Sequence, residues 1–166
     1  RGVRGVGAAV VKHDGRQVVL DTNVLVHLIR GGTAGQLLEQ TFQIGARRPR
    51  AVVPVVVKGE IKSLALKWGW GAGKLGKLNE LLAQLPTVDI AHDAVIQAYA
   101  EFDDLSRRQG RAVGKNDLWV AAVTAALNGV LLTTDKDFDH LAPTQMAREY
   151  IDPSALQAGR IESTDA

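Results

Sequence analysis

Apolar residues along this chain form short runs that alternate with longer segments in which they recur every three or four positions. A short apolar run that ends at a polar residue or a proline is typical of a buried strand. Such runs predict strands at residues 18–20, 51–53, 87–90 and 130–133, and a short final strand near residues 150–151. Residues 9–11 are a further candidate strand, ahead of the turn-like pair Asp14-Gly15.

The longer segments have the apolar spacing of helices that bury one face. They predict helices at residues 24–30, 34–44, 56–65, 75–85, 92–108 and 117–127. Strands that alternate with helices favour an α/β fold, here a three-layer α/β/α sandwich whose central sheet is mainly parallel. Ligands bind such sheets beyond the carboxyl ends of the strands, so the polar residues that follow each strand are candidates for a functional site.

Length and composition narrow the class of protein. A chain of 166 residues suits a single domain. It contains no cysteine, which excludes a disulfide-stapled mini-protein, a zinc–thiolate site and a thiol enzyme. Neither about 18 consecutive apolar residues nor the apolar core of a secretory signal is found, so we expect no membrane span and a cytoplasmic location.

The net charge of +2 conceals two charged regions of opposite sign. Residues 45–80 contain eight basic and two acidic residues, a net charge of +6, whereas residues 135–166 contain three basic and seven acidic residues, a net charge of −4. Basic and aromatic side chains together can follow a nucleic-acid backbone and stack on bases. The candidate RNA-binding residues are Lys58, Lys62, Lys67 and Trp68. The alternative is a solvated helix face with two partly buried indoles.

Four acidic residues occupy positions from which they could converge. Asp21 and Asp135 follow predicted strands, Glu60 interrupts the apolar face of a predicted helix, and Asp117 begins another helix. Taken singly, the aspartates could be helix caps or turn residues and Glu60 a surface residue. Taken together, two carboxylates about 5 Å apart repel by roughly 3 kcal/mol at an effective dielectric of 20, so a cluster needs protons or cations.

The chemistry of such a cluster follows from its donors. Oxygen ligands without cysteine or paired histidine favour Mg²⁺ or Mn²⁺ over Zn²⁺. These ions activate water and bridge phosphate oxygens, which is the arrangement used for phosphodiester hydrolysis.

Four segments resemble PIN-domain ribonucleases, and their order is most similar to the VapC-type toxins of prokaryotic toxin–antitoxin pairs. They are VLDTNVL at residues 19–25, the helix with Glu60, NDLWVAA at residues 116–122 and LLTTDKDF at residues 131–138. The resemblance covers about residues 18–151 and implies a metal-dependent endoribonuclease. It also implies an RNA substrate such as tRNA or rRNA, an antitoxin that blocks the acidic cleft, and homodimerisation through the apolar helices at residues 24–28 and 37–42.

The resemblance further implies roles for individual residues. The metal-binding catalytic set is expected to be Asp21, Glu60, Asp117 and Asp135. Asp137 is expected as an additional metal ligand, or as a group that supports the ligands from behind. Asn23 and Thr133 are expected to add polar contacts.

The expected domain organisation has three parts. Residues 1–17 form an N-terminal extension that is either flexible or foreign to the natural chain, residues 18–152 the nuclease domain, and residues 153–166 a C-terminal tail. Two other functions stay open at this level: an RNA-processing nuclease with no toxic role, and a nucleic-acid-binding module that does not cleave.

The basic residues just before Asp117 have two interpretations. Arg107, Arg108, Arg111 and Lys115 could grip a phosphate at the mouth of the cleft. Because Glu101, Asp103 and Asp104 lie close by in the sequence, a helix laced with solvated salt bridges is an equal alternative.

Overall fold

The computed structural model describes residues 10, 11 and 13–164. Its strands are β1 (Val18–Leu20), β2 (Val53–Pro54), β3 (Thr87–Val88), β4 (Val130–Thr133), β5 (Ala147–Ile151) and β6 (Ser163–Thr164). Its α-helices are α1 (Thr22–Arg30), α2 (Gly32–Phe42), α3 (Val55–Lys67), α4 (Ala72–Gln84), α5 (Asp93–Arg108), α6 (Lys115–Ala126) and α7 (Pro153–Gln157). A short 3-10 helix, η1 (His13–Gly15), precedes β1.

The strands form a mainly parallel sheet. β1, β4 and β5 are parallel neighbours, and β6 adds an antiparallel edge. The parallel pair β2–β3 extends the sheet on the other side of β1, because Val52 exchanges backbone hydrogen bonds with Val18 and Leu20 at 2.9 and 3.0 Å. The three residues of β1 are fully buried, as expected for a central strand covered on both faces.

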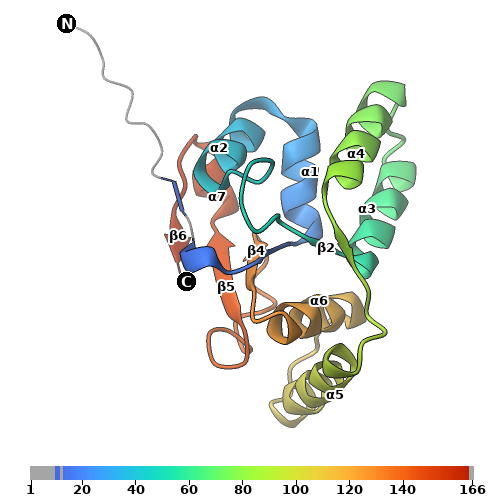
Figure 1. The fold of residues 1–166 in the computed structure, drawn as a ribbon, viewed down its shortest axis with the longest axis vertical. Coiled ribbons are helices and arrows are strands. Elements are labelled where there is room, and N and C mark those ends of the chain that lie inside the picture. The colour runs from blue at the N-terminus through green and yellow to red at the C-terminus, as the bar shows by residue number, and fades with distance from the viewer. Residues whose placement is uncertain (1–9, 12, 165–166) are drawn as a thin grey trace, which may run out of the picture.

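Helices cover both faces of this sheet (Figure 1). α1 and α2 lie on one side, while α6 lies on the other with α5 packed outside it. The hairpin of α3 and α4 stands beside α1 at the β2–β3 end. The α/β fold with a parallel sheet and covering helices, predicted from the alternation of apolar patterns, is confirmed.

The pattern of apolar residues missed some of the carboxyl-terminal elements. β5 begins at Ala147, well before the predicted residues 150–151. The apolar pattern missed its first half because Arg148 and Glu149 are charged, although both are buried. Each has a polar partner from elsewhere in the chain: Arg148 forms a salt bridge with Asp139, and Oε2 of Glu149 lies 2.8 Å from Nε2 of His13. Because these partners allow charged residues to be buried, a hydrophobicity pattern does not reveal this strand.

Segments before and after the predicted nuclease domain, residues 18–152, also pack on it: η1 on the amino-terminal side, and α7 and β6 on the carboxyl-terminal side. Nε2 of His13 contacts Oε2 of Glu149, and the imidazole stacks on Phe42 with ring centroids 6.1 Å apart. α7 packs against α2, with Leu156 fully buried, and β6 pairs with β5. Of the candidate strand at residues 9–11, Val10 and Val11 lie outside any strand, and Ala9 is outside the described residues.

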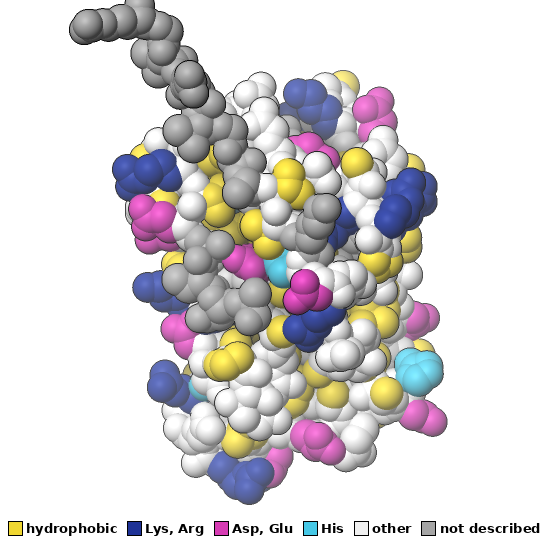
Figure 2. All heavy atoms as spheres, turned by 60° about the vertical axis from the view of Figure 1, so that its left-hand side comes forward, with side chains coloured by type: hydrophobic (Ala, Val, Ile, Leu, Met, Phe, Trp, Pro, Cys, Tyr) yellow, Lys and Arg dark blue, Asp and Glu magenta, His cyan; other side chains and the backbone are white. Residues whose placement is uncertain are grey.

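The surface is mixed in charge on the side of β5 and β6. Figure 2 shows basic and acidic side chains interspersed with apolar ones on this face, without one continuous patch of either sign. Among the described residues, no helix is long and apolar enough to cross a membrane.

Replacing a core leucine tests the packing of the sheet. Leu132→Ala removes a fully buried side chain from β4, and we expect it to lower the free energy of unfolding by about 2–5 kcal/mol. Leu66→Ala is the matched control, because Leu66 is 81% exposed and its loss should change stability by less than about 0.5 kcal/mol. Denaturant titration followed by circular dichroism measures both, and equal effects of the two changes would contradict the assigned core.

Candidate functional site

The site begins where β1 and β4 end. Leu20 lies opposite Leu132 in the parallel register, so the next residues, Asp21 and Thr133, are brought side by side. The hydroxyl of Thr133 donates to Oδ2 of Asp21 at 2.6 Å, while Oδ1 of Asp21 accepts the backbone N–H of Thr22 at 2.8 Å. Asp21 is only 5% exposed. It caps α1 and is also held at the sheet edge, so the cap and site interpretations of this residue are compatible.

A chain of hydrogen bonds arranges the loop after β4. Oγ1 of Thr133 accepts the backbone N–H of Asp135 at 3.0 Å, and Oδ1 of Asp135 accepts the backbone N–H of Asp137 at 2.9 Å. One carboxylate oxygen each from Asp117, Asp135 and Asp137 lie within 4.8 Å of one another. Asp135 at the end of β4 and its neighbour Asp137 therefore meet the helix-borne Asp117 in space, while Asp21 lies outside this group of three and is linked to it by its charge and through Thr133.

Asp117 approaches from the first turn of α6, which begins after Gly114. A Cβ atom at Gly114 would stand 3.3 Å from Oδ2 of Asp117, tighter than ordinary contact. A side chain at residue 114 would therefore crowd this carboxylate. The importance of Gly114 has no signal in the sequence, because the close approach arises only when α6 is formed.

Glu60 completes the acidic group from α3, which packs against α6. Its charge raises the pKa of both Asp21 and Asp117, which places it in the same electrostatic environment as the other acids. It is half-buried and does not belong to the group of three carboxylates within 4.8 Å.

Burial and mutual repulsion perturb two of the acids strongly. Burial raises the pKa of Asp21 from 3.8 to about 6, opposed by the hydrogen bonds from Thr133 and Thr22 and assisted by the charges of Asp135 and Glu60. Burial also raises the pKa of Asp117 to about 7, assisted by the charges of Asp21, Asp135, Asp137 and Glu60. Among the described residues neither Asp21 nor Asp117 forms a salt bridge, so the site favours a proton or a bound cation.

The remaining predicted residues lie outside this cluster. Asn23 is exposed in the first turn of α1. Lys58 reaches toward β3, with its Nζ 3.3 Å from Oγ1 of Thr87. Lys62 and Lys67 are exposed on α3, and Trp68 follows its last residue. The structure thus groups the acids and keeps the basic candidates along α3.

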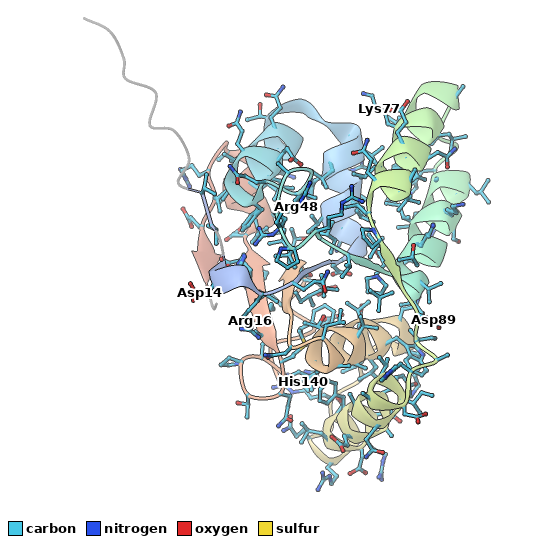
Figure 3. The ribbon with its side chains drawn as sticks, in the orientation of Figure 1. Asp14, Arg16, Arg48, Lys77, Asp89 and His140 are labelled. Atoms are coloured by element: carbon cyan, nitrogen blue, oxygen red, sulfur yellow. The ribbon has the colours of Figure 1, made fainter. Side chains whose placement is uncertain are left out.

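Other acids serve elsewhere. Asp139 pairs with Arg148, and Asp14 and Asp89 lie at opposite sides of the molecule in Figure 3. These three acids do not belong to the acidic group.

Most of the basic residues before Asp117 form salt bridges with acids of α5. Nζ of Lys115 lies 2.8 Å from Oδ1 of Asp103, and Nε of Arg108 lies 2.9 Å from Oδ2 of Asp104, which also pairs with Arg107. This arrangement favours the salt-bridged helix over a phosphate grip.

One contact that supports the loop after β4 could not be predicted from the sequence. Nε2 of His140 lies 2.7 Å from Oγ of the buried Ser106, and that hydroxyl also donates to the carbonyl of Phe102 at 2.7 Å. His140 therefore ties the loop that carries Asp135 and Asp137 to α5, in the lower part of Figure 3. The two residues are 34 positions apart, so no local pattern could pair them.

The raised pKa values predict a particular pH dependence in the absence of divalent ions. Between about pH 4 and pH 7 the folded protein binds more protons at Asp21 and Asp117 than the unfolded chain does, so their contribution to stability falls as pH rises through this window. Asp117→Asn removes the charge of this half-buried side chain. In a chelator at pH 8 we expect it to stabilise the protein by about 1–2 kcal/mol, less than the full rise in the Asp117 pKa would give, because solvent screens part of the repulsion.

Thermal unfolding in a chelator from pH 4 to pH 8 measures this effect. The gain from Asp117→Asn should shrink toward pH 4, where the parent carboxyl is already protonated. Glu80→Gln is the control, since Glu80 is an exposed acid on α4. A pH profile of the Asp117 variant parallel to that of the parent would contradict the perturbed titration.

Comparison with known proteins gives a consistent family. The model of the PIN domain matches residues 18–143. Ribonuclease VapC1 of Haemophilus influenzae is 26% identical over 131 residues, which cover 76% of this chain and 93% of the relative.

Solved structures agree in fold. VapBC-5 of Mycobacterium tuberculosis, a member of the VapBC family of toxin-antitoxin systems, aligns with a TM-score of 0.58 and 27% identity, over 78% of this chain and 93% of the other. VapBC2 of Rickettsia felis, bound to a DNA fragment from its promoter, aligns with a TM-score of 0.64 and 21% identity, over 81% of this chain and 98% of the other. Because the family model spans most of the sequence, including all the acids of the site, this chain belongs to the PIN-domain family.

Proposed function

We propose that this protein is a divalent-metal-dependent endoribonuclease that hydrolyses RNA phosphodiester bonds and acts as the toxin of a toxin–antitoxin pair. The observation that carries the proposal is the meeting of Asp117, Asp135 and Asp137 within 4.8 Å, beside the buried Asp21. With Glu60 on α3, five acids come from the end of β1, from α3, from α6 and from the loop after β4. The fold itself does not require them to lie near one another. Their repulsion is tolerable when they hold a cation.

The donor set fits Mg²⁺ or Mn²⁺. All the converging groups are carboxylates, and hard divalent cations prefer oxygen ligands. Asp117, Asp135 and Asp137 would hold the ion, with Asp21 and Glu60 completing its negative surroundings. A bound divalent ion supplies Lewis acidity toward a phosphate and lowers the pKa of a coordinated water.

The protein's own contribution is to fix the acids before substrate arrives. Thr133 is fully buried, and its hydroxyl donates to Asp21 while accepting from the backbone of Asp135. One side chain thus sets the relative position of two acids on different segments. Such outer hydrogen bonds orient ligands and keep them from rearranging when charge changes at the site.

The toxin role and the partners rest on the relatives. A ribonuclease VapC1 and several VapBC toxin–antitoxin structures resemble this chain over most of its length. We propose by this likeness an RNA substrate such as tRNA or rRNA, a cognate antitoxin that covers the acidic cleft, and a cytoplasmic location.

A homodimer belongs to the same proposal, but of the apolar side chains on the early helices only the partly buried ones, such as Leu28 and Leu37, are available for it. Val24, Leu25, Leu38 and Phe42 are fully buried in the monomer's own core and are unavailable for contact with a second copy. The exposed large apolar side chains within the described residues include Val55 on α3 and Ile96 on α5, which are better placed for such a contact.

Two substitutions test the catalytic assignment. We expect Asp117→Asn to lower the rate of RNA cleavage in Mg²⁺ or Mn²⁺ by more than about 100-fold, because it removes a charged ligand. Thr133→Val keeps the side chain's shape and removes only the hydroxyl, so we expect an intermediate loss of about 10–100-fold. Single-turnover cleavage of labelled RNA measures both, with Glu80→Gln as the control. Cleavage by Asp117→Asn at the parent rate would refute these roles.

Metal binding can be tested without activity. A saturating divalent ion that binds only the folded state stabilises it by about 2.7 kcal/mol at 100 times its Kd. We expect Mn²⁺ to raise the thermal midpoint of the parent saturably and to have a much smaller effect on Asp117→Asn. A non-cleaving module whose acids are only caps would respond equally little in both proteins.

Expression in a bacterial host separates a toxin from an RNA-processing enzyme. We expect the parent chain to arrest growth, Asp117→Asn to be harmless, and co-expression of a small DNA-binding protein encoded next to this gene to restore growth. A catalytically active protein that leaves growth unchanged would favour RNA processing instead.

A further inference from the structure

The end of α3 presents an aromatic surface that the acidic site does not use. Trp68 is 43% exposed, whereas its neighbour Trp70 is nearly buried, with ring centroids 5.8 Å apart. The guanidinium of Arg30, at the end of α1, lies 5.1 Å from the centre of the Trp68 ring. The ammonium of Lys74, on α4, lies 5.8 Å from that of Trp70. Three helices thus build one cluster of two indoles and two cations.

The backbone holds this cluster firmly. The N–H of Trp68 donates to the carbonyl of Leu64 at 2.8 Å, and that of Trp70 donates to the carbonyl of Ala65 at 3.0 Å. Gly69 turns the chain between them with a φ of +61°, a conformation that favours glycine. The exposed indole is therefore positioned by a helix end and does not depend on a mobile loop.

The surroundings of the indoles are positively charged. Residues 58–77 contain five lysines and one glutamate. Within the described part of the chain, no carboxylate pairs with Arg30, Lys62, Lys67 or Lys74, in contrast to the basic residues of α5. Lysine is depleted from protein–protein interfaces, so unpaired lysines around an exposed tryptophan favour a polyanion over a protein partner.

The cluster is aligned with the acids along α3. Lys67 follows Glu60 by seven residues, which puts the two on the same face of the helix about 10 Å apart along its axis. Trp68 lies about 12 Å from Glu60 by the same measure. At a rise of about 3.4 Å per stacked nucleotide, this distance corresponds to three or four nucleotides.

From these observations we infer that Arg30, Trp68, Trp70 and Lys74 form a subsite for single-stranded RNA, in which a base three or four nucleotides from the scissile phosphate stacks on Trp68. The inference rests on the proposed ribonuclease function and specifies the form of its substrate. Stacking uses the π-face that every base has, so the subsite selects unpaired RNA over a duplex more than one sequence over another. Lys67 contacts the phosphate backbone between the acids and the indole.

Binding measurements in a cleavage-deficient background test the subsite. The full chain carrying Asp117→Asn is titrated into a fluorescein-labelled single-stranded RNA octanucleotide of mixed sequence. Adding Trp68→Ala should raise the Kd by about 5- to 150-fold, the range expected for one lost base–aromatic stack, and Trp68→Phe should raise it less.

Leu66→Ala is the matched control, because Leu66 is exposed beside Trp68 and offers apolar surface without an aromatic ring. We expect this change to alter the Kd for RNA by less than twofold. Equal losses for Leu66→Ala and Trp68→Ala, together with a fall in oligomeric mass by light scattering, would overturn the subsite in favour of a contact between protein chains. Unchanged RNA binding by Trp68→Ala would also overturn it.

The test separates this inference from the proposed activity. If the parent cleaves RNA and Trp68→Ala binds the octanucleotide equally well, the subsite alone is wrong. If RNA binding depends on Trp68 while the parent shows no metal-dependent cleavage, the proposed activity is wrong and the subsite stands. A parent chain that binds neither single-stranded nor duplex RNA overturns the subsite.

Discussion

The hydrogen bond between Thr133 and Asp21 connects the packing of the core to the geometry of the acids. It forms because β1 and β4 are parallel neighbours in a register that places Leu20 opposite Leu132. That register is set by fully buried apolar side chains, and a slip of one residue would send them to the wrong face of the sheet. The Thr133 hydroxyl also accepts the backbone N–H of Asp135, and the carboxylate of Asp135 accepts that of Asp137, so the same strand pairing positions all three acids. The site is thus a consequence of strand pairing.

Buried charge is handled in two different ways in this fold. On β5, Arg148 pairs with the oppositely charged Asp139, and Glu149 forms a hydrogen bond with the imidazole of His13, so each buried charge has a partner within the protein. At the carboxyl edge of β1 and β4, Asp21 and Asp117 are surrounded by further acids, and the pKa of each is raised. Paired buried charges are explained by the fold itself, whereas a cluster of like charges costs stability and needs a ligand to explain it.

Much of the fold and the acidic site could be predicted from sequence, for identifiable reasons. β1 and β4 are apolar runs that end in polar residues, and the rule that parallel strands present their carboxyl ends together directs attention to Asp21 and Asp135. What escaped prediction depends on distant partners. β5 was obscured by its charged residues, and the contact between Ser106 and His140 joins segments with no sequence pattern in common. The buried faces of α1 and α2 looked equally suitable for a dimer contact, because amphipathicity does not reveal which partner covers a face.

Acidic and basic side chains share α3. Glu60 lies on it near the acids, and Lys62 and Lys67 lie on its exposed surface, so one helix bridges the acidic and basic parts of the molecule. Bare acids would repel the phosphate of an approaching RNA, and a cation among them would reverse that repulsion locally. The exposed lysines act at longer range, over roughly a Debye length of 8–10 Å at physiological salt. A polyanion would therefore be attracted to α3 whatever the state of the acids, and its phosphate would approach them closely only once a cation is bound. On this argument, affinity for RNA and the capacity to cleave it are separable properties of neighbouring surfaces.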